Sequence, residues 1–155
     1  MGVDAVVKYN FHNRLFSELN LSYTDARFNL RYDQHGTEYI YYKDRLRNTP
    51  YFTTNWSVEY VADGWLGKES RLAFSYNMGY VHQFYRNWES LGGAGKAVIP
   101  SQLVHDIGIT YSFLKRQLSL SFDVKNLFNE QVFDNWALQR PGRMFLVKLS
   151  YAISK

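Results

Sequence analysis

The sequence contains no cysteine and only three prolines among its 155 residues. Without cysteine, neither a disulfide framework nor thiolate chemistry is available. No stretch approaches the roughly 18 consecutive apolar residues that a membrane-spanning helix needs. The 18 basic and 14 acidic residues are scattered along the chain, so a formal charge of +4 does not mark a patch for binding nucleic acid. A soluble domain and a membrane protein built from strands both remain open.

Aromatic residues, by contrast, are abundant, at 18% of the chain with 13 tyrosines. Many of them fall near one expected end of the strands, as in the aromatic girdle of a membrane barrel. A negative mean hydropathy is compatible with that class, because half of each transmembrane strand faces a polar lumen. The aromatic residues at this end are Tyr39, Tyr41, Tyr42, Tyr51, Tyr80, Phe84, Tyr85, Trp88, Phe133 and Trp136.

Seven segments alternate apolar and polar residues with a period of two, which indicates β-strands rather than helices. In the last of them Val147 and Leu149 alternate with Lys148 and Ser150. The sequence therefore predicts an all-β protein, an antiparallel up-and-down meander of about seven strands that is part of a large transmembrane β-barrel. The segments are residues 3–11, 18–24, 55–62, 71–80, 106–113, 118–125 and 145–153.

The connections between these segments alternate between short and long. Short turns are expected at residues 12–14, 63–68 and 114–117, and long loops at 33–49, 86–100 and 128–142. This alternation is typical of outer-membrane barrels, whose short turns face the periplasm and whose long loops face outside. We therefore expect a periplasmic C-terminus.

The apolar pattern also predicts how the strands pair, because a slip of one residue would exchange the two faces. Phe113 is expected opposite Leu118, and Tyr60 opposite Leu72. One face is expected to carry the apolar side chains towards lipid, and the other to carry polar ones towards a lumen. The expected apolar set is Leu72, Phe74, Tyr76, Phe122, Val147 and Leu149, and the expected polar set is Arg71, Asn77, Asp123, Lys125 and Lys148.

Candidate chemistry is sparse. No nucleophile elbow, phosphate-binding loop or catalytic constellation appears, and we predict that the chain is not an enzyme and holds no metal or cofactor. His82 and His105 flank the same long loop, and with Tyr80 opposite Ile107 they would face each other; two polar interfacial side chains are the simpler interpretation. Aromatic residues in the long loops are candidates for ligand contact: Tyr39, Tyr41, Tyr42, Trp88 and Trp136.

The last thirty residues carry a recognisable motif. Asn126-Leu127-Phe128-Asn129 is followed by Pro141-Gly142-Arg143 and then by the alternating terminal strand. Together they resemble the C-terminal end of TonB-dependent outer-membrane receptors, most closely those of the Bacteroidetes type. From the residues alone, both asparagines suit a strand exit, since asparagine bonds to nearby backbone and tolerates a left-handed conformation. The motif marks the fold rather than the transported ligand.

The resemblance implies that residues 1–155 are the C-terminal portion of a receptor barrel in the outer membrane of a Gram-negative cell. The family takes up scarce ligands such as iron chelates, haem, cobalamin or oligosaccharides. Its expected partners are outer-membrane lipid, the remaining strands, the plug domain and, through that plug, the TonB complex; nucleic acid is not among them. The family barrel has about 22 strands, and neither plug nor signal peptide is seen here. We therefore expect a fragment that is inactive alone.

Two other interpretations stay open. A small outer-membrane barrel, acting as porin or adhesin, would need an even number of strands, which an extra strand in residues 37–43 would supply. A soluble β-barrel that binds a small lipophile would bury the apolar face inside. Terminal strands of outer-membrane barrels commonly end on an aromatic residue. The terminal strand here departs from that pattern, because Tyr151 is followed by four more residues.

Overall fold

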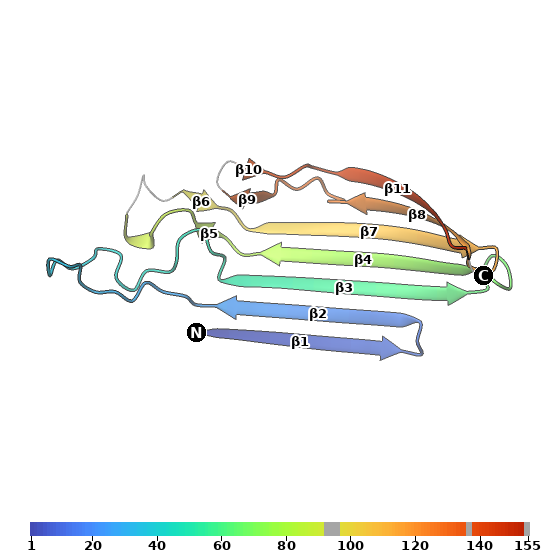
Figure 1. Ribbon diagram of the computed structural model, residues 1–155, viewed down its shortest axis with the longest axis horizontal. Helices are drawn as coiled ribbons and strands as arrows, with labels where there is room; N and C mark the ends of the chain where they lie inside the picture. The colour runs from blue at the N-terminus through green and yellow to red at the C-terminus, as the bar shows by residue number, and fades with distance from the viewer. Residues whose placement is uncertain (92–96, 136–137, 154–155) are drawn as a thin grey trace.

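The computed structural model describes residues 1–91, 97–135 and 138–153, and in them the chain is all-β. Seven long strands form one antiparallel sheet in the order β1-β2-β3-β4-β7-β8-β11, so strands adjacent in the chain order are adjacent in space (Figure 1). The predicted seven-stranded meander is confirmed. The strands are β1 (Gly2–Phe11), β2 (Leu15–Thr24), β3 (Phe52–Asp63), β4 (Arg71–Val81), β7 (Gln102–Phe113), β8 (Leu118–Lys125) and β11 (Met144–Tyr151).

The remaining elements are short and lie at the end of the sheet where the long loops are (Figure 1). β5 (Phe84–Tyr85) pairs with β6 (Val98–Ile99), and β9 (Phe133–Asn135) pairs with β10 (Leu138–Gln139). A single 3-10 turn, η1 (Glu89–Leu91), is the only helical element in the described residues. The described part of the chain therefore has no helix with the length and apolarity that a membrane span requires.

One face of the sheet is apolar across its whole width. Cross-strand neighbours lie on the same face of a sheet, so the register defines continuous rows of side chains. The predicted apolar set lies on this face, because its members fall on such rows. One row crosses all seven strands, through Phe11, Leu15, Tyr60, Phe74, Ile109, Phe122 and Val147.

The opposite face carries polar rows. Lys8 forms an ion pair with Glu18 at 3.1 Å, and Lys125 forms one with Asp106 at 3.1 Å. Gly108 in β7 leaves room for the carboxylate of Asp123 on the next strand. A Cβ atom at position 108 would lie 2.4 Å from Oδ1 of Asp123. All five members of the predicted polar set lie on this face: Arg71, Asn77, Asp123, Lys125 and Lys148.

The short turns set the register. In the β1–β2 turn His12 and Asn13 take left-handed φ values of 51° and 54°, and the N–H of Arg14 donates to the carbonyl of Phe11 at 3.0 Å. The predicted pairing of β7 with β8, from Phe113 opposite Leu118 onwards, is confirmed.

The predicted pairing of β3 with β4 is wrong by two residues. Tyr60 lies opposite Phe74 instead of Leu72. The turn was expected at residues 63–68, but seven residues separate Asp63 from Arg71, which pair across its base and form a side-chain ion pair at 3.0 Å. A shift of two residues keeps every side chain on its predicted face, since the period of a strand is two.

Both faces and both edges of the sheet are open in the described residues. The outer strands β1 and β11 are exposed along nearly their whole lengths, and the apolar row remains largely solvent-accessible. Buried apolar side chains are few and dispersed: Val61, Leu72, Phe84, Ile99, Val124 and Val132. A single sheet with an uncovered apolar face does not form the enclosed core of a soluble domain.

Candidate ligand-binding site in the long loops

The loop between β2 and β3 folds back on itself instead of adding a strand. The N–H of Phe28 donates to the carbonyl of Asp44 at 2.9 Å, and the N–H of Lys43 donates to the carbonyl of Phe28 at 2.9 Å. Isolated bridges join Arg27 to Arg45 and Tyr32 to Glu38. Residues 40–43 form a turn and Glu38 makes only an isolated bridge, so the extra strand that a small barrel would need is not found at residues 37–43.

Four aromatic rings from two loops form a cluster, which we call the loop aromatic cluster. Tyr41 stacks on Trp88 with ring centroids 4.9 Å apart and an interplanar angle of 13°, and Tyr39 stacks on Tyr41 at 5.0 Å. Phe28 makes edge contacts with all three, at 5.0 to 5.4 Å. Such ring pairs contribute about 0.5–1.5 kcal/mol each beyond area burial. Phe28 was not predicted, because a lone aromatic in a loop has no periodic pattern.

The structure therefore divides the predicted ligand contacts. Tyr39, Tyr41 and Trp88 come together, but much of their ring surface packs against other rings. Tyr42 lies apart from this stack and faces two cations, with the guanidinium of Arg31 at 5.7 Å and Nζ of Lys43 at 5.0 Å from its ring centroid. The fifth candidate, Trp136, lies outside the described residues.

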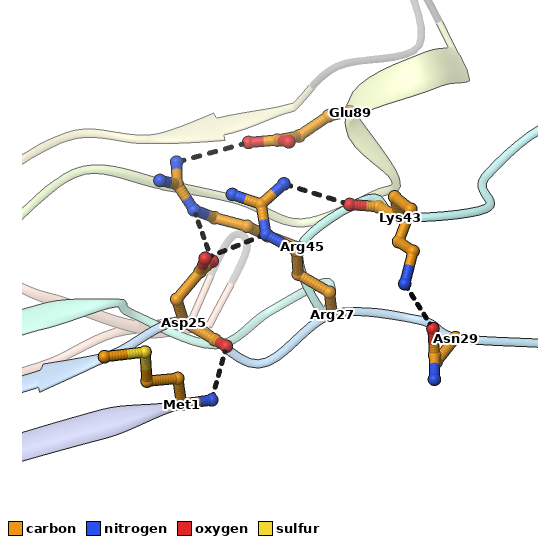
Figure 2. A network of polar contacts seen from close by, with 7 residues as sticks. All are labelled: Met1, Asp25, Arg27, Asn29, Lys43, Arg45 and Glu89. Atoms are coloured by element: carbon orange, nitrogen blue, oxygen red, sulfur yellow. Dashed lines mark hydrogen bonds and ion pairs between the residues drawn. The ribbon is translucent and has the colours of Figure 1, made fainter.

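A polar network connects these loops to the start of the chain (Figure 2). The carboxylate of Asp25 accepts from Nε of Arg27 at 2.8 Å and from Nε of Arg45 at 3.2 Å. A second guanidinium nitrogen of Arg45 lies 3.6 Å from Glu89 in the next long loop. The amino group of Met1 donates to the backbone carbonyl of Asp25 at 3.0 Å. The hydrogen bond from Arg27, followed by that from Arg45, lowers the pKa of Asp25, and the same bond raises the pKa of Arg27.

Asp44 fixes the two loops to each other. Its side chain is only 8% exposed, and it accepts hydrogen bonds from the backbone N–H of Ser90 at 2.8 Å and from the Ser90 hydroxyl at 2.6 Å. Ser90 lies in η1, so the carboxylate satisfies a donor of that turn. The N–H of Asn48 also donates to the carbonyl of Tyr85 at 2.7 Å. The loops between β2 and β3 and between β4 and β7 thus form one folded unit.

The third long loop is built on the terminal motif. Asn126, with φ of 51°, bonds both backbone groups of Glu130 through its side-chain amide at 2.8 Å, and its N–H donates to Asp106 at 2.8 Å. Asn129, with φ of 57°, accepts from the N–H of Arg143 at 2.9 Å. A Cβ at Gly142 would lie 2.4 Å from that same Oδ1 atom, so any larger residue there would require the Asn129 side chain to move.

The other members of the motif serve the same loop. The N–H of Leu127 donates to the carbonyl of His105 at 2.7 Å, and the ring of Phe128 meets the His105 ring edge-on at 5.0 Å. Pro141 precedes the glycine at the end of the loop. The motif, as expected from the residues, shapes the loop.

A buried glutamine, which was not predicted, joins this third loop to β7. The side chain of Gln102 donates to the carbonyl of Phe133 at 3.0 Å and accepts from the Phe133 N–H at 2.7 Å. Its amide thereby pairs with β9 as a strand backbone would. No sequence pattern marks this role, because the partners are separated by 31 positions.

His82 and His105 do not face each other across the sheet. Tyr80 lies opposite Leu103, not Ile107, so the two histidines are displaced along the sheet. Each instead bonds a tyrosine hydroxyl through Nδ1 at 2.8 Å, His82 to Tyr80 and His105 to Tyr76. Within residues 1–91, 97–135 and 138–153, no group of three or more histidine, aspartate or glutamate side chains could hold a metal ion.

Comparison of the chain with models of protein families, with curated proteins and with solved structures finds no significant match.

Proposed function

We propose that this chain is a section of the wall of a larger outer-membrane β-barrel. The apolar face, with a row that crosses all seven strands, would face lipid, and the polar face would line the lumen. Transmembrane barrels alternate apolar and polar residues in this way. The long loops would lie outside the cell and the short turns in the periplasm.

The direction of the two edge strands carries this proposal. Seven antiparallel strands in meander order leave β1 and β11 running in the same direction, so they cannot pair antiparallel with each other. Their outward N–H and C=O groups would cost several kcal/mol each in lipid if they stayed unpaired. A fully antiparallel barrel therefore needs an odd number of further strands between β1 and β11.

The terminal motif supports a narrower assignment. Asn126 to Asn129 and Pro141 to Arg143 resemble the end of TonB-dependent receptors, and here they close one loop through the Asn129 side chain. In this proposal the complete receptor takes up a scarce ligand, such as an iron chelate, haem, cobalamin or an oligosaccharide. A plug domain outside these 155 residues would connect it to the TonB complex. The loop face around Tyr42 would contribute to ligand contact.

The open apolar face distinguishes this proposal from a soluble barrel, which would bury such a face inside. Residues 37–43 form no strand, which distinguishes the proposal from an eight-stranded porin or adhesin. Sequencing the reading frame upstream of Met1 tests the proposal. A secretion signal, a plug domain and an odd number of further strand segments would support it. A secretion signal followed directly by this chain would contradict it.

A further inference from the structure

The turn between β3 and β4 exposes two large apolar side chains. Trp65 is 66% exposed and Leu66 is 61% exposed. The hydroxyl of Tyr111, which points from the apolar face, donates to the carbonyl of Leu66 at 3.3 Å. Leu72, the cross-strand neighbour of Tyr111, is only 3% exposed, in agreement with a turn that folds over this face. The turn therefore lies on the apolar side of the sheet.

The neighbouring turn between β7 and β8 has the same character. Leu114 is exposed, and the rings of Tyr111 and Phe113 beside it stack with centroids 5.3 Å apart. Lys68 in the first turn and Lys115 in the second form no ion pair within the described part of the chain. Both turns thus combine exposed apolar side chains with an unpaired ammonium group.

The two ends of the sheet differ in charge. The short turns and the residues that flank them, 12–14, 63–71 and 114–117, hold five basic and two acidic side chains, a net charge of +3. The much longer loops at the other end, residues 25–51, 82–101 and 126–143, hold nine basic and seven acidic side chains, a net charge of +2. Positive charge is therefore more concentrated at the short-turn end.

We propose that the short-turn end binds anionic phospholipids of the leaflet that surrounds it. Trp65 and Leu66 occupy the boundary between headgroups and acyl chains, where tryptophan is favoured. Lys68 and Lys115 bind the phosphate groups, while Arg71 and Arg116 are held by Asp63 at 3.0 Å. This inference rests on the proposed function, because that proposal puts the apolar face in lipid.

Quenching of single tryptophans tests the inference. The intact barrel, with any tryptophan outside residues 1–155 replaced by phenylalanine, is dissolved in mixed micelles of a zwitterionic detergent with brominated phosphatidylglycerol or brominated phosphatidylcholine at equal mole fraction. One variant, Trp56→Phe/Trp88→Phe/Trp136→Phe, keeps Trp65. A second, Trp65→Phe/Trp88→Phe/Trp136→Phe, keeps Trp56, which lies on the apolar face of β3. Trp65 should be quenched up to about fivefold more by the anionic lipid, the preference that one basic residue near an anionic surface provides.

Charge variants in the Trp65 background provide the control. Lys68→Gln/Lys115→Gln should bring the two lipids to equal quenching, whereas Lys43→Gln/Lys148→Gln, which removes two charges elsewhere, should preserve the preference. Equal quenching of Trp65 before any lysine is changed, or an equal effect of both double variants, overturns the inference. Quenching of Trp56 by both lipids reports separately on the proposed function. If Trp56 is shielded from both lipids, it is the lipid-facing assignment that fails.

Discussion

The side-chain oxygen of Asn129 accepts a hydrogen bond from the backbone N–H of Arg143, fourteen positions further along the chain, at 2.9 Å. The same oxygen occupies the space that a Cβ atom at Gly142 would need. One atom thus explains why the two halves of the terminal motif occur together. The left-handed φ of 57° at Asn129 aims its side chain at the point where β11 begins.

This relationship predicts a non-additive pair of substitutions. In the intact barrel, Gly142→Ala should lower the free energy of unfolding by about 1–3 kcal/mol, because the new methyl group overlaps Asn129. Adding Asn129→Ala should cost less than the sum of the two single changes, because that change removes the overlapping oxygen. A double-mutant cycle from urea unfolding measures the coupling. Strict additivity would show that the contact is absent.

The lipid-facing assignment predicts a difference between adjacent residues of β8. Leu120→Arg should cost about 2–4 kcal/mol of folding free energy in a bilayer if Leu120 lies near the midplane. Ser119→Arg, on the polar face, should cost less than about 1 kcal/mol. Folding equilibria of the intact barrel in vesicles measure both. Equal costs at the two positions would argue that the faces do not differ in their surroundings.

The network at Asp25 predicts a pH dependence of loop order. A carboxyl whose pKa is lowered on folding contributes stability that is present above its ordinary pKa of about 3.9 and is lost as pH falls through the lowered value. The protection of backbone amides in residues 25–51 against hydrogen exchange should therefore stay high at neutral pH and fall only below about pH 4. Asp25→Asn should exchange faster at neutral pH and lose this dependence. A wild-type profile that matches the variant at every pH would refute the role of Asp25.

The contact of Asp44 with Ser90 predicts that two loops open together. Asp44→Ala leaves the N–H and hydroxyl of Ser90 without their acceptor, and such a loss typically costs about 1–3 kcal/mol. Limited proteolysis should then cleave both residues 25–51 and residues 82–91 faster than in the wild type. Asp33→Ala is the matched control, because the Asp33 carboxylate lies in the same first loop and accepts from the nearby N–H groups of His35 and Thr37. Faster cleavage in the first loop alone would show that the loops are independent.

Much of the sheet could be predicted from local patterns. The alternation of side chains fixes which residues share a face, and the apolar match between residues 107–113 and 118–124 fixes that register. The register of β3 with β4 was predicted two residues away from the observed one, because a shift of two leaves the faces unchanged and the pattern cannot detect it.

The site was less predictable, since its contacts join distant parts of the chain. Aromatic composition pointed to Tyr41 and Trp88 but not to their stacking, which depends on how two loops fold. Asp44 and Ser90 are separated by 46 positions and no periodicity relates them. The pairing considered for His82 and His105 is not formed, because it required a register four residues from the observed one.

If this sheet is a section of a larger barrel, as we propose, it should not fold alone. The test is to express residues 1–155 without detergent and to examine the product by size-exclusion chromatography and circular dichroism. The open edges of β1 and β11 and the uncovered apolar face predict aggregated material with no soluble monomer. A soluble monomer that melts cooperatively would contradict the account and favour a small soluble barrel.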